Sequence, residues 1–353
     1  MSGADIAGPV RAATRSLEVV RLDPYNAETP ARALQHAVTP ADNTYVRTNF
    51  GVPTLTDEHT IHVDGGVAPA MTLTLAMLRE MPWHTVTATM ECAGNDRLGI
   101  RPLPVGEPWR HGALSTVSWA GVSLVDVLDM VGVRPDTVEV LLTAADSGLR
   151  DDAQGLVRFA RSLPIADAQR RDTLLALEMN GAPLTPEHGA PVRLAVPGWY
   201  GMASVKWVTR IELLHTPYDG YFQRQRYVYD DATGIAPVDR MRVKSIVSTP
   251  RDGARCSRLL TVTGWAWSGY GAITAVDLCV DGGSEWQAAR LGAPMSAHAW
   301  TPWSATIESP RAGRIVLRSR ATDATGARQP DAIVWNRLGY GNNAIRHIVV
   351  EVD

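Results

Sequence analysis

The chain changes character near residue 240, and this change limits the folds that it can adopt. From Val243 onward, short β-prone runs alternate with turn residues, as in residues 261–267, 273–280, 314–321 and 347–352. About seven short strands over roughly 110 residues, with several tryptophans and little helix, are typical of a β-sandwich. We therefore place a domain boundary at 238–243, near Pro237, and predict an Ig-like β-sandwich over residues 241–353.

Residues 1–240 mix predicted helices and strands without a regular alternation. The first 40 or so residues are polar and form a surface arm around the first domain. We expect strands at residues 45–48, 60–66, 138–143, 174–179 and 204–213, helices at 71–79 and 124–131, and a loop at 146–148. Ser123 and Gly132 are suited to begin and end the second helix. Because no repeating βαβ order is present, we predict an α+β domain over residues 1–240.

The composition excludes some classes of partner. The 353 residues are 45% hydrophobic and 20% charged, and the formal net charge is −3. Such a small charge creates no overall field that would attract nucleic acid or an anionic membrane, so anions must bind at local arginines. No stretch reaches the roughly 18 apolar residues that a membrane span requires.

The N-terminus and the cysteines bear on the compartment. The first 20 residues contain no apolar run of signal-peptide length and no adjacent pair of arginines. We expect a cytoplasmic protein, or a periplasmic one if an export signal has been removed. Three cysteines are too few for a disulfide framework. Cys256 and Cys279 could pair or simply pack in the second domain, which leaves Cys92 as the odd one.

Cys92 ends an alternating run and is followed at once by a turn. Every second residue from Val86 to Cys92 is apolar, so a strand here presents the thiol on its apolar face. Gly94-Asn95 is a turn-forming pair, and the nearby charge of Arg97 favours the thiolate, which ligates metals or attacks carbon. On this stretch alone two interpretations stay open, a reactive or metal-binding thiol and a small buried hydrophobe in a core strand.

Residues 90–97, Met-Glu-Cys-Ala-Gly-Asn-Asp-Arg, resemble the cysteine motif of the sulfite oxidase family of molybdenum enzymes. Further blocks on both sides of this motif occur in the same order along the chain as in that family. They include Tyr-Val-Arg-Thr-Asn at 45–49, Trp-Arg-His-Gly-Ala-Leu at 109–114, Leu-Glu-Met-Asn-Gly at 177–181, His-Gly-Ala-Pro-Val-Arg at 188–193 and Val-Lys-Trp at 205–207. The resemblance covers roughly residues 40–350. Several blocks in the right order are far more specific than a lone Cys-Ala-Gly-Asn motif.

The resemblance implies a molybdenum–molybdopterin cofactor, with Cys92 as the protein ligand to the metal. It assigns Arg47 and Arg97 to a pocket for a small oxyanion, Tyr227 to a position near the metal and Trp109 to the pocket wall. The implied cofactor-binding residues beside Cys92 are Tyr45, Asn49, Asp146, His188, Arg193, Ser204, Lys206 and Trp207. The implied fold is a mixed α+β molybdopterin-binding domain followed by an Ig-like dimerisation domain, in a homodimer.

The implied activity is oxidation of sulfite to sulfate by oxygen-atom transfer, with electrons passed to an external acceptor such as a cytochrome c or dioxygen. The sequence has no haem-binding segment before the first domain and no Cys-x-x-Cys-His site, so a separate carrier is expected. Arginine suits this substrate because its guanidinium stays charged and recognises oxyanions with a planar fork of donors.

Three positions depart from the pattern of the family. Asn49 stands where the family has a histidine, and Asp96 stands where a basic residue is usual before Arg97. The motif Trp-Asn-Leu-Arg-Gly is Trp-Asn-Arg-Leu-Gly here, over residues 335–339, so either Arg337 or Leu338 would face the pocket. We expect a pocket that is less cationic than in the relatives, which leaves the identity of the substrate open.

Other functions remain to be separated from sulfite oxidation. A family member that reduces or oxidises another small S- or N-oxo compound would carry the same motifs. A cofactor-free cysteine hydrolase would pair Cys92 with a histidine such as His188. A non-catalytic binding protein could be built around the tryptophan-rich sandwich.

Overall fold

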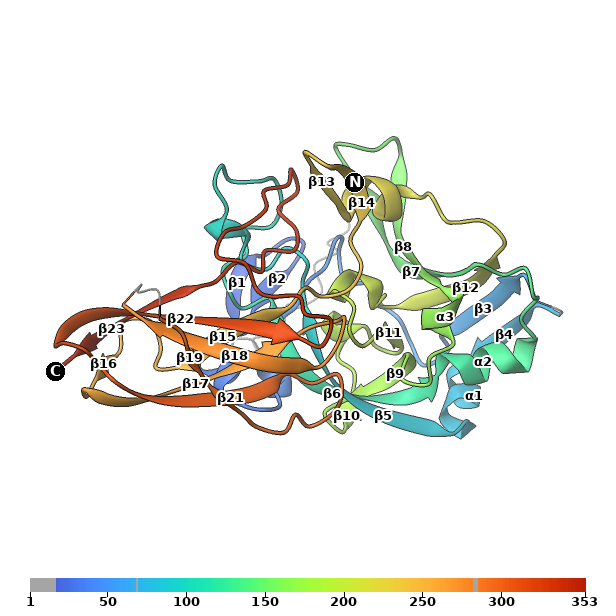
Figure 1. Ribbon diagram of the computed structural model, residues 1–353. Helices are drawn as coiled ribbons and strands as arrows, with labels where there is room; N and C mark the ends of the chain where they lie inside the picture. Colours follow the sequence, from blue (N-terminus) through green and yellow to red (C-terminus); the bar gives the residue numbers. More distant parts are fainter. Residues whose placement is uncertain (1–16, 68, 282–284) are drawn as a thin grey trace, which may run out of the picture.

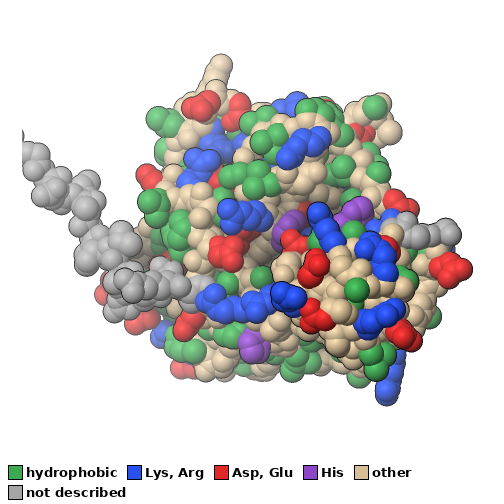
Figure 2. Space-filling model, turned by 90° about the vertical axis from the view of Figure 1, so that its left-hand side faces the viewer, with side chains coloured by type: hydrophobic (Ala, Val, Ile, Leu, Met, Phe, Trp, Pro, Cys, Tyr) green, Lys and Arg blue, Asp and Glu red, His purple; other side chains and the backbone are tan. Residues whose placement is uncertain are grey.

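The computed structural model describes residues 17–67, 69–281 and 285–353, and it consists of a mixed α+β region and a β-sandwich that lie side by side (Figure 1). Residues 1–16, most of the segment considered for an export signal, lie outside the described residues. Within the described ranges, no helix is long and apolar enough to cross a membrane. Acidic and basic side chains are interspersed on the face shown in Figure 2, in keeping with the net charge of −3.

Two five-stranded sheets form the centre of the mixed region. The first has the order β10-β9-β6-β5, with β11 also paired to β9, and contains β5 (Trp83–Glu91), β6 (Leu114–Ser123), β9 (Leu174–Met179), β10 (Ala182–Pro183) and β11 (Arg193–Ala195). The second has the order β4-β3-β12-β7-β8, with β3 (Thr60–Gly65), β4 (Met71–Thr74), β7 (Glu139–Leu149), β8 (Leu156–Pro164) and β12 (Val208–Leu214). Because β5 ends at Glu91, the thiol of Cys92 lies just beyond the end of a fixed strand.

Three short helices complete this region, α1 (Leu75–Glu80), α2 (Leu124–Val131) and α3 (Ile165–Ala168). The predicted apolar face of α2 is buried in the main core. Gly132 follows α2 with a φ of +69°, as the sequence predicted for a helix end. Ser123 precedes α2, but its hydroxyl donates to the carbonyl of Arg171 instead of capping the helix.

The C-terminal part is a sandwich of a four-stranded and a five-stranded sheet (Figure 1). The first has the order β15-β17-β21-β20, with β15 (Lys244–Thr249), β17 (Leu259–Trp267), β20 (Arg290–Leu291) and β21 (Thr301–Glu308). The second has the order β16-β23-β22-β18-β19, with β16 (Arg255–Cys256), β18 (Ile273–Val280), β19 (Gln287–Ala288), β22 (Gly313–Asp323) and β23 (His347–Val352). Inward-facing residues such as Val262, Leu278 and Leu317 are buried between the sheets, which is the packing that the alternating runs predicted.

Two small hairpins lie outside these sheets, β1 (Glu18–Arg21) with β2 (Asn26–Glu28) and β13 (Val228–Asp231) with β14 (Gly234–Pro237). The arm after β2 does more than wrap the first region, because it also joins the sandwich. The indole of Trp265 donates to the carbonyl of Leu34 at 2.7 Å, and that of Trp300 donates to the carbonyl of Ala37 at 2.9 Å. The two tryptophans stack with ring centres 4.8 Å apart, so these rings serve the contact between the two parts.

Four local predictions are wrong. Residues 45–48 form no strand, since only Val46 makes an isolated bridge, with Ala27. Residues 71–74 are strand β4, and the helix begins after Thr74 because its hydroxyl accepts from the amide of Met77. Residues 146–148 lie inside β7 rather than in a loop, and residues 204–207 precede β12 in a loop. Of the two alternatives left open for Cys256 and Cys279, pairing and simple packing, the structure shows both thiols free and no disulfide between them.

Candidate active site

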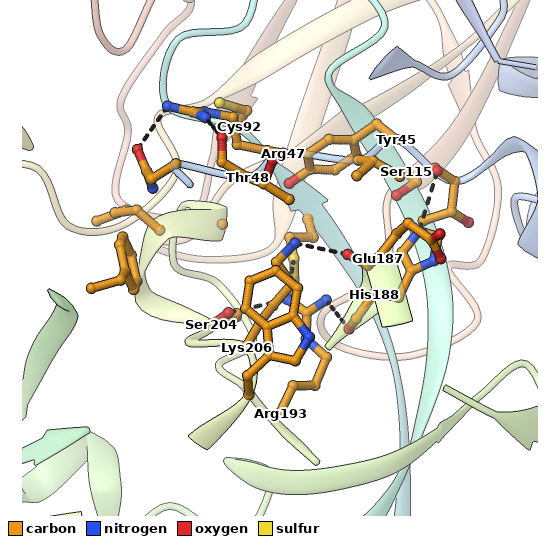
Figure 3. Close-up of a pocket in the computed structure, with 18 of the residues that line it drawn as sticks. Tyr45, Arg47, Thr48, Cys92, Ser115, Glu187, His188, Arg193, Ser204 and Lys206 are labelled. Carbon is orange, nitrogen blue, oxygen red and sulfur yellow. Dashed lines mark hydrogen bonds between the residues drawn. The ribbon is translucent and has the colours of Figure 1, made fainter. Parts of the chain in front are cut away.

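Two cavities meet at Cys92, and together they are lined by all thirteen residues that the sequence singled out. Both cavities are lined by Arg47, Asn49, Cys92 and Tyr227. The inner cavity adds Tyr45, Asp146, His188, Arg193, Ser204, Lys206 and Trp207. The outer cavity adds Arg97 and Trp109. Cys92 and Arg47 lie at one end of the inner cavity, and Arg193 and Lys206 lie at the other (Figure 3).

The cations of the inner cavity are held by backbone carbonyls. Arg193 donates to the carbonyls of His188 at 2.9 Å and Ser204 at 3.1 Å, and its guanidinium lies 4.6 Å from the ring centre of Trp119. Lys206 donates to the carbonyl of Glu187 at 2.7 Å. No carboxylate within the described ranges forms a salt bridge with either cation. The charges are therefore fixed in place but not neutralised.

His188 is fixed at both ring nitrogens. Its Nε2 contacts the carbonyl oxygen of Thr44 at 3.3 Å and its Nδ1 contacts the hydroxyl of Thr185 at 2.9 Å. Burial, together with the charges of Lys206 and Arg193, lowers the pKa of His188 to about 3. A neutral ring then donates from Nε2 to the carbonyl and accepts at Nδ1 from the hydroxyl.

The electrostatics of the inner cavity favour an anionic ligand. Burial and the charge of Arg193 hold the pKa of Lys206 well below its usual range, and burial lowers the pKa of Arg193 to about 10. Burial also raises the pKa of Asp146 to about 6, against the opposing charge of Lys206. A phosphate at this end would raise the pKa of both cations, since a nearby anion stabilises the protonated forms.

Two buried polar atoms of the inner cavity lack a hydrogen-bond partner among the described residues. They are Oδ1 of Asp146 and Nε1 of Trp119. Leaving such atoms unpaired costs roughly 1–3 kcal/mol each, so they indicate a ligand with complementary groups. A nitrogen-rich ring with N–H donors would suit Asp146, and a phosphate would suit the cations, which is the donor set of a pterin cofactor.

The outer cavity contains a chain of polar contacts that links an arginine to a tyrosine. Nη2 of Arg47 donates to Oδ1 of Asn49 at 2.8 Å, and Nδ2 of Asn49 donates to the hydroxyl oxygen of Tyr227 at 3.3 Å. Because the amide of Asn49 is the donor, the Tyr227 O–H is left to donate elsewhere. Asn49 therefore orients the phenol without adding a group that titrates.

Arg97 enters the outer cavity from the turn after Cys92. Its Nε donates to the carbonyl of Leu338 at 3.0 Å and its Nη1 donates to the carbonyl of Glu107 at 2.7 Å. Its guanidinium also lies 5.1 Å from the ring centre of Tyr340. Trp109 is fully buried in the cavity wall, and its Nε1 has no partner among the residues described. A bound oxyanion could accept from the remaining Arg97 donors and from this indole.

Several residues of the outer cavity were not predicted from the sequence. Arg150, Arg226 and Tyr340 line it, as do the carboxyl-bearing Glu107, Asp151 and Asp152. Arg226 pairs with Asp152 at 3.1 Å, and Arg21 pairs with Glu107 at 2.9 Å. Tyr340 directly follows the 335–339 block and could have been noticed there, whereas nothing in the sequence connects Arg150 with residue 92.

The charge of Arg97 favours the thiolate form of Cys92, as predicted, but it does not suffice in the protein alone. Burial raises the pKa of Cys92, and this effect exceeds the lowering by Arg47 and Arg97. The bare thiol is therefore protonated at neutral pH, and a metal would have to displace its proton. Among the described residues, no group of three or more His, Cys, Asp and Glu side chains could hold a metal ion.

Two of the three sequence departures lie outside the cavities. Arg337 is directed away from the site and pairs with Asp230, while the Leu338 side chain is buried in the main core. Asp96 does not line either cavity; its carboxylate contacts Lys244 at 2.6 Å and His111 on the other side. The expectation that Asp96 weakens the pocket charge directly is therefore wrong, because its carboxylate is paired with Lys244 away from both cavities.

Comparisons with known proteins agree with this geometry. Residues 49–222 match the model of the oxidoreductase molybdopterin binding domain, and residues 236–353 match the Mo-co oxidoreductase dimerisation domain. Mitochondrial sulfite oxidase of Mus musculus is 36% identical over 355 residues, covering 93% of this chain and 64% of its own length. Sulfite oxidase of Gallus gallus is 36% identical, covering 93% of this chain and 76% of its own length. This chain thus spans about two thirds of the mouse relative.

A solved structure is similar over almost the whole chain. The sulfane dehydrogenase SoxCD from Paracoccus pantotrophus has a TM-score of 0.82 and 28% sequence identity, and the match covers 99% of this chain and 96% of that chain. The similarity therefore includes both the α+β region and the sandwich.

Proposed function

Because the chain belongs to the sulfite oxidase family of molybdopterin oxidoreductases, we propose that it oxidises sulfite to sulfate with a molybdenum cofactor and passes electrons to an external acceptor. The observation that carries this proposal is the position of Cys92. Its thiol lies where a cation-rich inner cavity meets an arginine-lined outer cavity. A metal bound there by sulfur could contact a cofactor on one side and a small oxyanion on the other.

The inner cavity fits the cofactor. Arg193 and Lys206 would hold its phosphate, and Asp146 would accept from N–H groups of the pterin. His188, neutral and fixed by Thr185 and Thr44, would line the same cavity with Tyr45, Ser204 and Trp207. When bound, the cofactor supplies a metal centre that exchanges an oxygen atom and two electrons.

Residues of the outer cavity would bind and orient the substrate. Arg47 and Arg97 provide guanidinium charges, which recognise oxyanions with a planar fork of donors. At about 4 Å and an effective dielectric near 20, each such charge contributes roughly 4 kcal/mol of attraction to an anion before desolvation. Trp109 offers one further donor from a buried indole, which would fix one oxygen of the anion.

Tyr227 would complete the site as a donor. Asn49 already donates to its oxygen, so the phenolic proton is free to point toward the substrate. Its ring is held against Tyr340, with ring centres 5.4 Å apart, and against Phe159 and Phe222. The rigid mounting supports a role in orienting substrate and in accompanying electron transfer with a proton.

A second candidate substrate is a sulfur compound with less negative charge, as the sulfane dehydrogenase SoxCD suggests. The observation that favours it is the outer cavity wall, where Tyr340 is present and Arg337 points away. Carboxylates of Asp151 and Asp152 also lie in this wall. These groups reduce the net positive charge that a dianion requires.

The cysteine hydrolase alternative receives little support. Both ring nitrogens of His188 are engaged, by Thr185 and Thr44, and neither contacts the Cys92 thiol. A nucleophile and its base would need to lie within hydrogen-bond reach.

Two measurements on the purified protein test the proposal. Metal analysis should give about one molybdenum per chain, and sulfite should reduce ferricyanide or cytochrome c at a rate proportional to that content. Parallel assays with dimethyl sulfoxide, an uncharged S-oxo compound, and a reduced dye as electron donor should be slower. Molybdenum-loaded protein that turns over dimethyl sulfoxide but not sulfite would favour the second candidate, and protein without molybdenum would contradict both.

The match to a dimerisation domain supports a homodimer built on the sandwich. Light scattering of the purified protein should give a mass near twice the 38.2 kDa of one chain. A monomer at micromolar concentration would contradict this assembly. The cytoplasmic location stays a prediction.

A further inference from the structure

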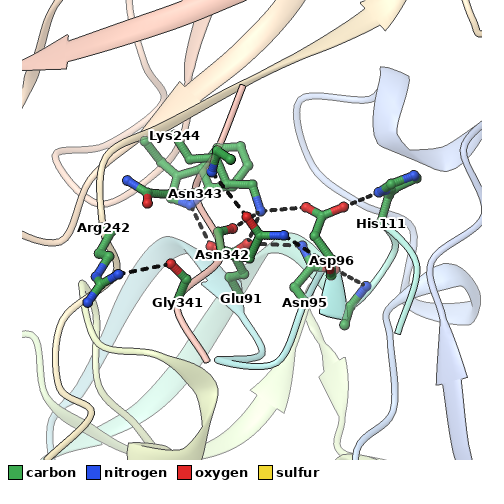
Figure 4. A network of polar contacts seen from close by, with 12 residues as sticks. Glu91, Asn95, Asp96, His111, Arg242, Lys244, Gly341, Asn342 and Asn343 are labelled. Atoms are coloured by element: carbon green, nitrogen blue, oxygen red, sulfur yellow. Dashed lines mark hydrogen bonds and ion pairs between the residues drawn. The ribbon is translucent and has the colours of Figure 1, made fainter. Parts of the chain in front are cut away.

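The turn that carries Cys92 and Arg97 is held from behind by the C-terminal part of the chain. On the side of β5 opposite to the cavities, Glu91 and Asp96 point toward Lys244, the first residue of β15 (Figure 4). Glu91 directly precedes the thiol and Asp96 directly precedes Arg97. One lysine of the sandwich therefore contacts both ends of the turn.

The ammonium of Lys244 is buried and uses all of its hydrogen-bond donors. Its side chain is 1% exposed, and its ammonium donates to Oε1 of Glu91 at 2.8 Å, Oδ2 of Asp96 at 2.6 Å and the carbonyl of Asn342 at 2.9 Å. An ammonium has three N–H donors, so every donor is used. A buried charge with this geometry has one low-energy position, which fixes the groups around it.

The two carboxylates are also held by neutral donors. Glu91 accepts from the amide of Asn95 at 2.9 Å and from the indole of Trp267 at 3.1 Å. Asp96 contacts His111 through its second oxygen, and its backbone carbonyl accepts from the Asn342 amide at 2.9 Å. The network therefore joins three segments, residues 91–96, the 109–114 loop and the sandwich.

The backbone of the turn depends on these contacts. Asp96 has a φ of +64°, a left-handed conformation that a non-glycine residue adopts only when its surroundings hold it there. The Gly341 amide also donates to the carbonyl of Ala93 at 2.7 Å. Release of Asp96 would let the turn relax, and Arg97 would move with it.

Arg97 has little room for such movement. A side-chain carbon on Gly94 would lie 2.3 Å from Nη2 of Arg97, so the guanidinium packs directly against the turn backbone. Its other contacts are to carbonyls of Leu338 and Glu107. The orientation of its donors in the outer cavity therefore follows the shape of the turn.

We propose that Lys244 is a positioning residue of the active site, which holds Cys92 and Arg97 on one face of the turn through Glu91 and Asp96. The sandwich thereby completes the site as well as serving assembly. Lys244 contacts neither cavity, so it acts only through the turn. The expected effect on substrate binding rests on the proposed function, in which Arg97 binds the substrate anion.

The test compares Lys244→Met with Lys244→Arg and with Val262→Ala in the molybdenum-loaded protein. Val262 is fully buried in the sandwich core and has no contact with the network, so Val262→Ala lowers stability without releasing the turn. Lys244→Met should raise the KM for sulfite by about 10–100-fold, since small misplacement of a binding group is costly. Lys244→Arg should recover part of this loss.

Hydrogen–deuterium exchange gives a readout that does not depend on turnover. Amides in a peptide covering residues 92–99 should exchange faster in Lys244→Met and remain at wild-type rates in Val262→Ala. An unchanged KM with unchanged exchange in Lys244→Met would overturn the proposal, as would equal changes in Val262→Ala at matched loss of Tm.

If Lys244→Met does not fold, the variant Asp96→Asn tests the same network. It leaves Lys244 paired with Glu91, so no buried carboxylate loses its cation, and it should still speed exchange over residues 92–99. Wild-type rates in that variant would contradict the role of the network. If the wild-type protein does not oxidise sulfite, the proposed function fails, while the exchange data still decide whether Lys244 holds the turn.

Discussion

The inner and outer cavities share Cys92 but hold their charges in different ways. In the inner cavity, the buried Arg193 and the half-buried Lys206 are bound to carbonyls, without a salt bridge to a described carboxylate. In the outer cavity, Arg226 pairs with Asp152 and Arg21 pairs with Glu107. The two inner cations therefore have no carboxylate partner among the described residues, whereas some arginines of the outer cavity are paired with a carboxylate of the protein.

This difference indicates how the two sides are used. An unneutralised buried charge is costly, so a resident anion such as a cofactor phosphate would stabilise the inner cavity. Paired charges near solvent exchange partners at little cost, which suits a substrate that enters and leaves. We therefore expect inner substitutions to change cofactor content and outer substitutions to change substrate kinetics.

The largest effect is expected at the residue that both cavities share. Cys92→Ser should lower sulfite oxidation by more than about 100-fold, because even indirect partners of a metal ligand matter by 10–100-fold. Pterin content, measured by fluorescence after oxidative release, should stay near wild type because the inner cavity is intact. Activity of Cys92→Ser close to that of the wild type would refute Cys92 as the ligand.

Substitution of one arginine in each cavity separates their roles. Arg97→Met should raise the KM for sulfite by about 10–100-fold, the range for losing a hydrogen bond to a charged group, with molybdenum content unchanged. Arg193→Met should instead lower molybdenum content per chain and leave the KM of the loaded fraction near wild type. Metal analysis with steady-state kinetics on both variants checks this, and reversed outcomes would contradict the division between the cavities.

The buried histidine of the inner cavity should make stability depend on pH. Because the pKa of His188 is lowered to about 3, the unfolded chain binds a proton below pH 6.5 that the folded protein does not bind. As the pH is lowered below 6.5, the free energy of unfolding should therefore decrease by about 1.4 kcal/mol per pH unit, or about 2 kcal/mol between pH 6.5 and 5. His188→Gln should lack this part of the slope.

Urea unfolding at several pH values measures this slope. His62→Gln is a suitable control, since His62 is an exposed residue of β3 that lies outside both cavities. Equal slopes in wild type and His188→Gln would show that His188 is charged in the folded protein.

The sequence predicted the inner cavity better than the outer one for a physical reason. His188, Arg193 and Lys206 lie in a contiguous block, where local backbone geometry determines which side chains point inward. The outer cavity is assembled from separate segments around residues 21, 97, 107, 150, 226 and 340. Such long-range proximity depends on how sheets and loops pack, which no local pattern contains.

The absence of long-range contacts from local patterns also explains the wrong predictions about the fold and about the effect of Asp96. The alternating runs and turn pairs predicted the sandwich and most strands, since periodicity records which face is buried. Residues 146–148 look like a loop, yet they lie in β7, and Ser147 and Gly148 pair with β8 because the neighbouring strand continues past them. Asp96 looks unfavourable for anion binding until Lys244, 148 positions later, is found against it.

The smallest effect is expected at the ion pairs around the outer cavity, where Arg226 can be compared with Arg337 as a control. Arg226 lines the outer cavity and pairs with Asp152, while Arg337 is half-exposed, pairs with Asp230 and faces away. Arg226→Met should raise the KM for sulfite by about 2–5-fold, the equivalent of the 0.2–1 kcal/mol typical of exposed pairs. The effect should fade in high salt, because solvent-exposed charges are screened within about 10 Å at 0.1 M. Arg337→Met should leave the KM unchanged, and a larger effect there than at Arg226 would mean that Arg337 reaches the substrate.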